Sequence, residues 1–536
     1  MAGPAPVFAP PSAPPLTGAA MALGAFALAL SNFVVVLDIT IANVSVPHIS
    51  GSLAVSPSQG TWVITSYAVA EAICVPLTGW LAARFGAVRV FLLSLIGFGF
   101  FSLLCGLSQS LEALIAFRVM QGLCGAPIMP MSQTLLLRIF PPRKASAALG
   151  LWAMTTVCAP IAGPILGGLI SDNLSWHWIF FINLPIVAVC ATVAFRLIRR
   201  YETPTVQKPI DFIGLALLVV WVGALQIMLD KGREEDWFAS NLICTLGVVA
   251  VIGFVAFLIW ELTDRFPVVD LSVFRHRGFT VGVLTQSMSY AAFFAMVVLT
   301  PLFLQTNLDY TATVAGQAMG FMGVLAVVMS PIVAQLTTKF DVRGLICFGV
   351  SWLAMMALLR SDWTTGMDFF HIALPQFLQG FGMPFFFVGT TTLALGSVLP
   401  QETASAAGIQ NFMRTLSGAF ATSISATLWD RETKYAHAEL VGRVHPTAAM
   451  MQQGMVGRMT LERLVTTEAT TLATNTVFLG CAGILAFAAC FIWLAPRPKP
   501  RAAPATPPTP AAVVRAEPVA ASAPVRHPVP MAQGAA

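Results

Sequence analysis

The stretch 19–41, AAMALGAFALALSNFVVVLDITI, contains one charged residue, Asp38. A run of this length, wound as an α-helix at about 1.5 Å per residue, crosses a hydrocarbon core of about 30 Å. No Lys or Arg precedes it, and no small-residue cleavage site separates it from the next apolar run. We therefore expect a first transmembrane helix here rather than a removed signal peptide.

Similar apolar runs recur along the chain. Of its 536 residues, 57% are hydrophobic and only 10% are charged, and the mean hydropathy is +0.79. Soluble domains carry about 25% charged residues, so the composition excludes that class. Apolar runs separated by polar breaks predict an all-α polytopic membrane protein with 14 transmembrane helices. The predicted spans are 19–41, 60–82, 90–108, 112–136, 146–170, 177–199, 210–229, 241–262, 279–303, 312–336, 343–360, 371–397, 404–428 and 474–495.

Basic residues between the spans predict the orientation, because Lys and Arg favour short cytoplasmic loops. The loops after even-numbered spans contain Arg84, Arg89, Arg138, Arg143, Lys144, Arg196, Arg199, Arg200, Lys208, Arg265, Arg275, Arg277, Lys339 and Arg343. The short loops after odd-numbered spans contain only Lys231, Arg233 and the borderline Arg360. We therefore expect the even loops and both termini in the cytoplasm. The basic stretch 430–474 is expected on the far side, because long loops translocate largely regardless of charge.

Both ends of the chain are rich in Pro and Ala. Residues 1–18 and 497–536 cannot bury enough surface to fold, so we expect disordered cytoplasmic tails. A polar hinge from Arg199 to Lys208 separates an N-terminal half from the rest. The charge balance of +5 is carried by loops and tails, so no nucleic-acid surface is expected.

Among the ionisable side chains inside predicted spans, four are singled out as candidate sites, because a charge at the bilayer centre costs at least about 2.5–3.5 kcal/mol. Asp38 in span one and Glu71 in span two are candidate proton carriers, because desolvation favours a neutral carboxyl group. Alternatively, either is permanently paired with Arg118 of span four or with another donor, and Glu71 is alternatively a determinant of substrate charge. Arg414 of span thirteen, preceded by Asn411, either binds backbone carbonyls across a helix contact or binds substrate or protons directly.

Span five contains the run 159–168, APIAGPILGG. Small residues let helices approach closely, and proline frees carbonyl groups and bends a helix. The run favours a moving helix contact, with an ordinary kinked packing helix as the alternative.

No cofactor chemistry is visible in the sequence. The nine cysteines fall inside apolar runs without metal-ligand spacing, which is typical of small buried hydrophobes. His177 lies between two tryptophans typical of membrane-interface anchors, and no second histidine is placed to share a metal or haem. GxSxG, HExxH and phosphate-loop motifs are absent from the sequence, which disfavours a membrane enzyme and leaves an ion gradient as the energy source.

Several stretches in order resemble the fourteen-helix drug:proton antiporters of the major facilitator superfamily, and within them the EmrB-type exporters, over nearly all of 20–495. The stretch 37–47, LDITIANVSVP, is similar to the family's first-helix motif, so the resemblance assigns Asp38 to proton coupling. Arg118 with Gln121 and the following glycine matches the fourth-helix motif linked to proton transfer. The stretches TWVITSY at 61–67, WIFFIN at 178–183 and PVVDL at 267–271 also agree.

Two further motifs match, each with one departure. The loop after span two resembles the superfamily's cytoplasmic gate through Gly79, Arg84, Gly86 and Arg89, and span five resembles the antiporter motif through Gly163, Pro164, Gly167 and Gly168. Ala83 stands where the gate usually has the aspartate of its charge relay, and Ala159 replaces the first glycine of the antiporter motif. Residues expected to line the cavity or to pack beside it are Asn43, Gln121, Asn411 and Arg414.

The resemblance implies two six-helix bundles, 19–199 and 263–496, with the hinge and two additional helices at 200–262. It implies alternating access around a midplane cavity, export of hydrophobic drugs and toxic compounds in exchange for protons, and no cofactor. EmrB-type exporters are paired with a periplasmic adaptor, a membrane fusion protein, that continues to an outer-membrane channel, which implies a Gram-negative bacterial inner membrane. A dedicated exporter of one metabolite or toxin is the alternative, because cavity shape sets selectivity.

Overall fold

The computed structural model describes residues 14–141, 144–206, 209–443 and 455–497, and this part of the chain is helical without strands. Twelve helical segments are long and apolar enough to cross a membrane, and a bent helix, α8, makes a thirteenth. The predicted thirteenth span, 404–428, lies in a long helix that is too polar for this criterion. The described chain is thus all-helical as predicted, while the count of fourteen membrane crossings stays a prediction.

Prolines and glycines break several spans of the first half into shorter helices. Span two consists of α3, η1 and α4, with Pro76 in the break, and span four consists of α6 and α7, with Pro127 just before α7. The bent α8 turns by 44° between Ala147–Pro160 and Ile165–Ser171. The elements are α1 (Gly18–Ser52), α2 (Pro57–Gly60), α3 (Trp62–Cys74), η1 (Val75–Leu77), α4 (Thr78–Phe85), α5 (Ala87–Gly106), α6 (Leu111–Gly125), α7 (Ile128–Ile139), α8 (Ala145–Asn173), α9 (Trp178–Phe181), α10 (Asn183–Val193), η3 (Ala194–Ile198) and η4 (Arg199–Tyr201).

The second half has longer helices, several with internal proline. Pro301 lies inside α13, Pro331 inside α14, and Pro375 and Pro384 inside α16. The elements are α11 (Phe212–Lys231), η5 (Trp237–Ala239), α12 (Asn241–Thr263), η6 (Leu271–Arg275), α13 (Arg277–Asn307), α14 (Ala312–Lys339), α15 (Val342–Arg360), α16 (Phe369–Gly396), α17 (Thr403–Arg443), α19 (Met455–Phe491) and η7 (Ile492–Leu494). The described helices begin within three residues of the predicted span starts except for α19, which begins nineteen residues earlier than predicted.

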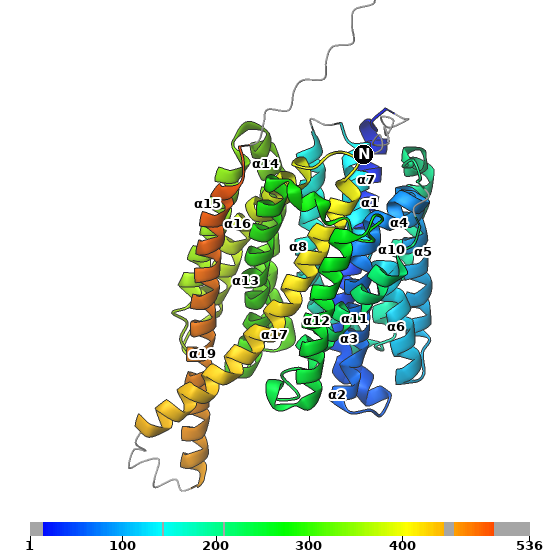
Figure 1. The fold of residues 1–536 in the computed structure, drawn as a ribbon. Coiled ribbons are helices and arrows are strands. Elements are labelled where there is room, and N and C mark those ends of the chain that lie inside the picture. Colours follow the sequence, from blue (N-terminus) through cyan, green and yellow to red (C-terminus); the bar gives the residue numbers. More distant parts are fainter. Residues whose placement is uncertain (1–13, 142–143, 207–208, 444–454, 498–536) are drawn as a thin grey trace, which may run out of the picture. The chain divides into compact units, whose positions relative to one another are not determined.

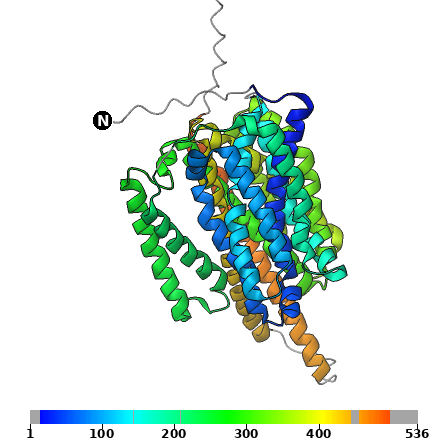
Figure 2. The ribbon, with the colours of Figure 1, turned by 90° about the vertical axis from the view of Figure 1, so that its right-hand side faces the viewer.

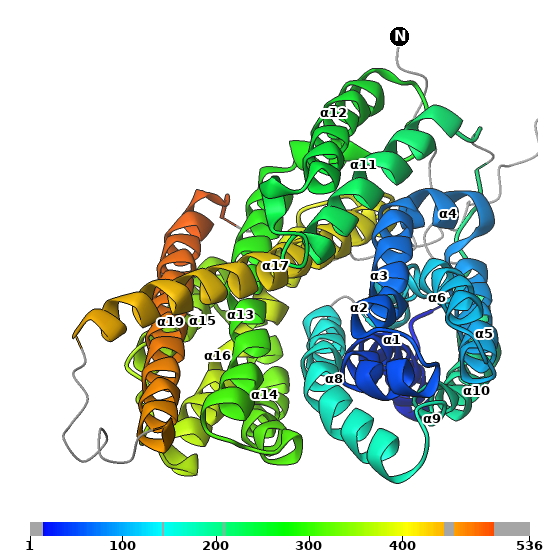
Figure 3. The ribbon, with the colours of Figure 1, turned by 90° about the horizontal axis from the view of Figure 1, so that it is seen from below.

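The helices pack as two groups, which Figure 3 separates when seen from below. In the first group α1 packs against α7, α8 and α10, and in the second α15 packs against α16 and α19. The groups meet where α8 packs along α14 and where α17 contacts α4, η1 and α7. Among the described residues no comparable packing joins α1 to α13.

The additional helices α11 and α12 pack on each other beside the two groups (Figure 2). α11 contacts α3 and α17, and polar side chains hold the end of this pair. Lys231 Nζ donates to Thr61 Oγ1 at 3.0 Å, and Arg233 Nε donates to Asp430 Oδ2 at 2.5 Å. Only 22% of the membrane-spanning part of α12 is buried, so this helix presents most of its apolar surface outward.

The predicted far-side loop at 430–474 is largely helical. Residues 430–443 continue α17 and residues 455–474 belong to α19, while 444–454 lie outside the described residues. Figure 1 shows the ends of α17 and α19 reaching beyond the neighbouring helices. The spacing of Met450, Met451, Met455 and Leu461 predicts local helix over 448–464, and this part is helical from Met455 onward, while 448–454 lie outside the described residues. The prediction of a loop was wrong for 430–443 and 465–474. A polar sequence with helical spacing extends a helix into water as readily as it forms a loop.

Candidate functional site

Asp38 forms the centre of a buried hydrogen-bond cluster in the first group of helices. Its side chain on α1 is fully buried, and Oδ2 accepts a hydrogen bond from Arg118 Nη1 of α6 at 2.5 Å. Oδ1 accepts from Gln121 Nε2 at 3.1 Å and from Asn183 Nδ2 of α10 at 2.7 Å. The structure thus brings Asp38, Arg118 and Gln121 together. It adds Asn183, which the sequence marked only as the last residue of the stretch WIFFIN at 178–183.

Arg118 also ties this cluster to α3. Its Nε donates to the backbone carbonyl of Val63 at 3.1 Å, and its guanidinium lies 4.2 Å from the ring centre of Tyr67. Nη1 shares its protons between Asp38 and Gln121 Oε1, the latter at 2.8 Å. Any change in the charge of Asp38 therefore acts through Arg118 on α3.

Glu71 lies one turn after Tyr67 on α3 and is 3% exposed. No hydrogen bond to its carboxylate is found within the described ranges, so Glu71 is not part of the Asp38 cluster. The cations that act on it electrostatically are Arg414 first and Arg118 second. The sequence left open which acid pairs with Arg118, and the structure assigns that pairing to Asp38.

Arg414 of α17 lies between the two groups of helices. Its Nη2 meets Met129 Sδ of α7 at 3.1 Å, and the rings of Trp152 and Tyr290 lie 5.6 Å from its guanidinium. Its Nε and Nη1 are buried and have no acceptor in the described part of the chain. Tyr290 in turn stacks on Phe294. An incompletely bonded cation among aromatic rings is suited to polar groups on an otherwise apolar ligand.

Buried amides join the two groups close to Arg414. Asn411 Nδ2 donates to Gln133 Oε1 of α7 at 2.8 Å and to the carbonyl of Ala407 in its own helix. Asn43, by contrast, lies on α1 with an exposed side chain, away from the Asp38 cluster.

The predicted gate loop lies where α4 meets α17. A methyl group on Gly79 would come within 2.7 Å of the Cα of Ser405, so glycine allows the two backbones to touch. Gly86, with φ of +93°, makes the turn from α4 to α5 in a conformation that favours glycine. The Arg84 guanidinium lies 5.5 Å from the ring centre of Trp80.

Glu202, from the hinge after span six, places a carboxylate at the start of α5, just after the loop that contains Ala83. Its Oε1 accepts from the backbone N–H of Val88 at 2.9 Å, and its Oε2 accepts from that of Arg89 at 3.1 Å. The side chain of Arg89 lies 3.9 Å from the same carboxylate. An anion at the start of α5 is favourable because the first N–H groups of a helix are unpaired and carry partial positive charge.

A related ion pair lies in the loop between α14 and α15. Arg343 Nη2 donates to Asp341 Oδ2 at 2.8 Å, and Nη1 donates to the carbonyl of Ala495 at 3.0 Å. The hydrogen bonds from Arg343 hold the pKa of Asp341 below its usual value. This pair therefore stays intact at neutral pH and is lost only as pH falls through the lowered pKa.

The glycines predicted in span five form the contact of α8 with α1. Gly163 faces Thr40, and a methyl group on Gly167 would lie 2.9 Å from the carbonyl oxygen of Ile41. Gly168 has no such neighbour, and the side chain of Pro164 lies outside the described part. Small residues thus bring α8 against the helix that carries Asp38.

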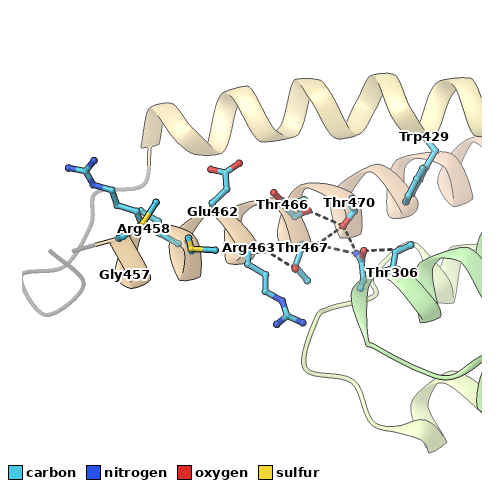
Figure 4. Close-up of a pocket in the computed structure, with 13 residues that line it drawn as sticks. Thr306, Trp429, Gly457, Arg458, Glu462, Arg463, Thr466, Thr467 and Thr470 are labelled. Atoms are coloured by element: carbon cyan, nitrogen blue, oxygen red, sulfur yellow. Dashed lines mark hydrogen bonds between the residues drawn. The ribbon is translucent and has the colours of Figure 1, made fainter. Parts of the chain in front are cut away.

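A cavity lies far from these residues, between α19, α17 and the end of α13 (Figure 4). Its volume is about 1150 Å³, and threonines, Trp429 and the charged Arg458, Glu462 and Arg463 line it. Asn307 at its edge donates to the carbonyl of Thr467 at 3.2 Å. None of the predicted site residues touches this cavity.

Metal chemistry finds no support in the described ranges. They contain no group of three or more His, Cys, Asp or Glu placed to hold a metal ion. All nine cysteines are free thiols.

Comparisons with known proteins agree with this fold. The family model of the Major Facilitator Superfamily matches residues 28–422. The chain is 45% identical over 496 residues to the multidrug export protein EmrB of Escherichia coli, covering 90% of this chain and 97% of that protein. It is 42% identical to the fatty acid resistance protein FarB of Neisseria gonorrhoeae, covering 90% and 98%.

A solved structure supports the fold alone. The human organic anion transporter MFSD10 superposes with a TM-score of 0.54 at 13% identity, covering 87% of this chain and 99% of that one. Together with the matched family model and the extent of the sequence identity, the helical architecture leads to one assignment. The chain belongs to the major facilitator superfamily, and within it to the EmrB-type transporters.

Proposed function

We propose that this protein exports hydrophobic, drug-like compounds across a bacterial inner membrane in exchange for protons, with Asp38 as the proton carrier. The observation that carries the proposal is the fully buried Asp38–Arg118 ion pair inside a membrane-spanning group of helices. Such pairs are costly in a membrane and mark proton or substrate paths. The identity to a multidrug export protein supports the direction of transport.

The proton acts through the contacts of Arg118. When Asp38 takes up a proton, its attraction for the guanidinium is lost, while Arg118 keeps its bonds to Gln121 and Val63. The freed cation then interacts more strongly with Glu71, the next acid in electrostatic range. Glu71 also interacts electrostatically with Arg414 of the other group, so in this proposal protonation alters the balance of charges between the two groups. A change in this charge balance would favour one arrangement of the two groups over the other, and alternating access requires such a shift between arrangements.

Substrate binds, in this proposal, beside Arg414. Trp152, Tyr290 and Phe294 offer aromatic faces, and Glu71 and Arg414 offer one charge of each sign. Aromatic surfaces adapt to varied apolar ligands, which suits a multidrug range. One proton moving down about 150 mV supplies roughly 3.5 kcal/mol, enough for about a 300-fold gradient of a neutral compound.

The partner proteins follow from the same family. We place both termini in the cytoplasm, from the basic even-numbered loops, and the projecting ends of α17 and α19 on the periplasmic side. A periplasmic adaptor leading to an outer-membrane channel would meet the exporter at that end.

The test is transport in inverted membrane vesicles with an imposed pH gradient, using a panel of lipophilic acids, cations and neutral compounds. Asp38→Asn keeps the shape but cannot exchange a proton, so gradient-driven transport should fall by at least about 100-fold while insertion is unchanged. Asp430→Asn, which loses an ion pair at the edge of α17, is the matched control and should transport normally. Full gradient-driven transport by Asp38→Asn would refute the assignment. Transport of one compound alone would favour a dedicated exporter.

A further inference from the structure

Arg360, the last residue of α15, is buried without an opposing negative charge. It is 1% exposed, and a guanidinium remains charged at every physiological pH. Within the described ranges no Asp or Glu lies at ion-pair distance from it. The titratable group that acts on it is the Cys481 thiol of α19, which supplies no negative charge while it remains protonated.

Two glutamine side chains of α16 hold Arg360 in place. Its Nη2 donates to Gln376 Oε1 at 2.6 Å and also to Gln379 Oε1. Both glutamines are 1% exposed. Because their carbonyl oxygens face the guanidinium, their amide groups point elsewhere. Gln376 Nε2, Gln379 Nε2 and Arg360 Nε are three buried donors that have no acceptor in the described part of the protein.

The Asp38 cluster shows what completes such an arrangement. On α6, Gln121 accepts from Arg118 through Oε1 and donates through Nε2 to the carboxylate of Asp38. On α16, Gln379 accepts from Arg360 through Oε1, but its Nε2 finds no acceptor. Each glutamine is followed by a glycine that packs tightly on a neighbouring helix, Gly122 on α3 and Gly380 on α14. The second cluster has the amide and the arginine of the first and lacks the acid.

We propose that Arg360, Gln376 and Gln379 form a buried site for a small monovalent anion, chloride or a short carboxylate, which takes the part that Asp38 plays beside Arg118. A water molecule could accept from the free donors but would leave the charge unbalanced. The ring centres of Trp363 and Phe478 each lie 6.0 Å from the guanidinium. Because Arg360, Gln376 and Gln379 are each only 1% exposed, a small anion is expected to reach them more readily than a large one.

The site is separate from the transport machinery proposed above. Arg360 lies at the end of α15 among α16 and α19, within the second group of helices, whereas Asp38, Glu71 and Arg414 lie in or against the first group. The anion therefore stabilises the second group rather than moving with the substrate. Its loss should lower thermal stability before it affects proton coupling.

The experiment measures thermal unfolding of the purified full-length protein in detergent with sodium chloride, sodium acetate or sodium gluconate at constant ionic strength. We expect a saturable rise in Tm with chloride, acetate or both, relative to gluconate, which is too large to enter. Arg360→Met should abolish this response. Arg343→Met is the matched control, because Arg343 is paired with Asp341, and it should keep the full response.

A second variant decides the case if Arg360→Met does not fold. Gln379→Glu places a carboxylate where the anion is proposed, so its Tm in gluconate should reach that of the wild type in chloride, with no further response to anions. Cys481→Ala should respond like the wild type. Equal Tm values of the wild type in all three salts, or an undiminished anion response in Gln379→Glu, would overturn the proposal.

Discussion

Three buried arginines, Arg118, Arg360 and Arg414, differ in what stands opposite their charge. Arg118 meets the carboxylate of Asp38 directly, Arg414 has Glu71 within electrostatic range, and Arg360 has only two amides. Removing one partner of a buried pair leaves an uncompensated charge, which costs about 3–5 kcal/mol. Arg118, which is paired directly with an acid, is therefore suited to proton coupling. Arg414 and Arg360, which are not, are suited to contact with a ligand.

The sequence identified most of these residues but not their pairing. Asp38, Glu71, Arg118 and Arg414 stood out because charges inside apolar runs are rare. Asn183 did not, since an asparagine near a helix start carries no such signal, and its bond to Asp38 joins residues 145 positions apart. Pairing depends on how the helices pack, and one sequence does not contain that information.

Glu71 provides a test at this scale. Its carboxylate accepts no hydrogen bond from the described residues and interacts electrostatically with Arg414. Glu71→Gln should therefore disfavour cationic compounds relative to neutral ones by about tenfold, as loss of one charge contact worth ~1.4 kcal/mol would do. Transport ratios in vesicles measure the effect. Glu112→Gln, at the exposed start of α6, is the control. An unchanged ratio with lowered stability would show that Glu71 serves only as a structural charge.

At the scale of elements, apolar runs predicted the spans well and their breaks less well. Most helix starts agree because a bilayer-length run must form its backbone hydrogen bonds internally. α17 falls below the hydropathy needed for a membrane span because it carries Gln410, Asn411 and Arg414, and it is stabilised by contacts with α4 and α7 instead. Hydropathy placed the start of the last span at 474 because it detects membrane depth rather than helix length, whereas the helical spacing at 448–464 predicted part of the helix that precedes it.

The hinge carboxylate Glu202 supports a prediction about α5. Glu202→Ala removes the acceptor for the N–H groups of Val88 and Arg89, which should cost about 1 kcal/mol, as for loss of a helix cap. We expect a lower Tm and slower transport. Glu202→Gln keeps one acceptor oxygen, so its Tm and its transport rate should fall between those of the wild type and of Glu202→Ala. If both variants matched the wild type in Tm and transport, Glu202 would not replace the acid missing at Ala83.

At the scale of the whole molecule, the two groups of helices touch closely where α4 meets α17 and do not pack comparably between α1 and α13 in the described part. If the basic loops are cytoplasmic, this is a state closed toward the cytoplasm. Gly79→Ala should destabilise it, because the methyl group would come within 2.7 Å of the Cα of Ser405. We expect slower transport by Gly79→Ala. The cysteine of Ser405→Cys should react faster with a thiol reagent when it is combined with Gly79→Ala than when Gly79 is kept. Gly223→Ala is the control, because a methyl group on Gly223 meets no atom within 4 Å. Normal transport by Gly79→Ala, with the same labelling rate of Ser405→Cys whether or not Gly79 is changed, would contradict the closed contact.

The projecting ends of α17 and α19 allow the partnership to be tested apart from transport. In the described part of this region α17 packs against α19, and the polar pairs are partly or fully exposed, among them Arg463 with Asp309 at 2.5 Å and His437 with Glu462 at 2.9 Å. Exposed ion pairs contribute about 0–1 kcal/mol. Replacing residues 440–466 by a short Gly/Ser linker should therefore leave transport in inner-membrane vesicles intact.

In whole cells the same replacement should weaken drug resistance and reduce co-purification with a periplasmic adaptor, because an adaptor must meet the exporter at its far-side surface. The double variant Glu462→Gln with Arg463→Gln removes the ion pairs but keeps the helices, and serves as the control with normal resistance. Equal loss of transport in vesicles would place this region in the transport cycle itself. The adaptor is expected at this end because α17 and α19 extend beyond the neighbouring helices (Figure 1). Unchanged resistance in cells would therefore mean that the adaptor docks elsewhere.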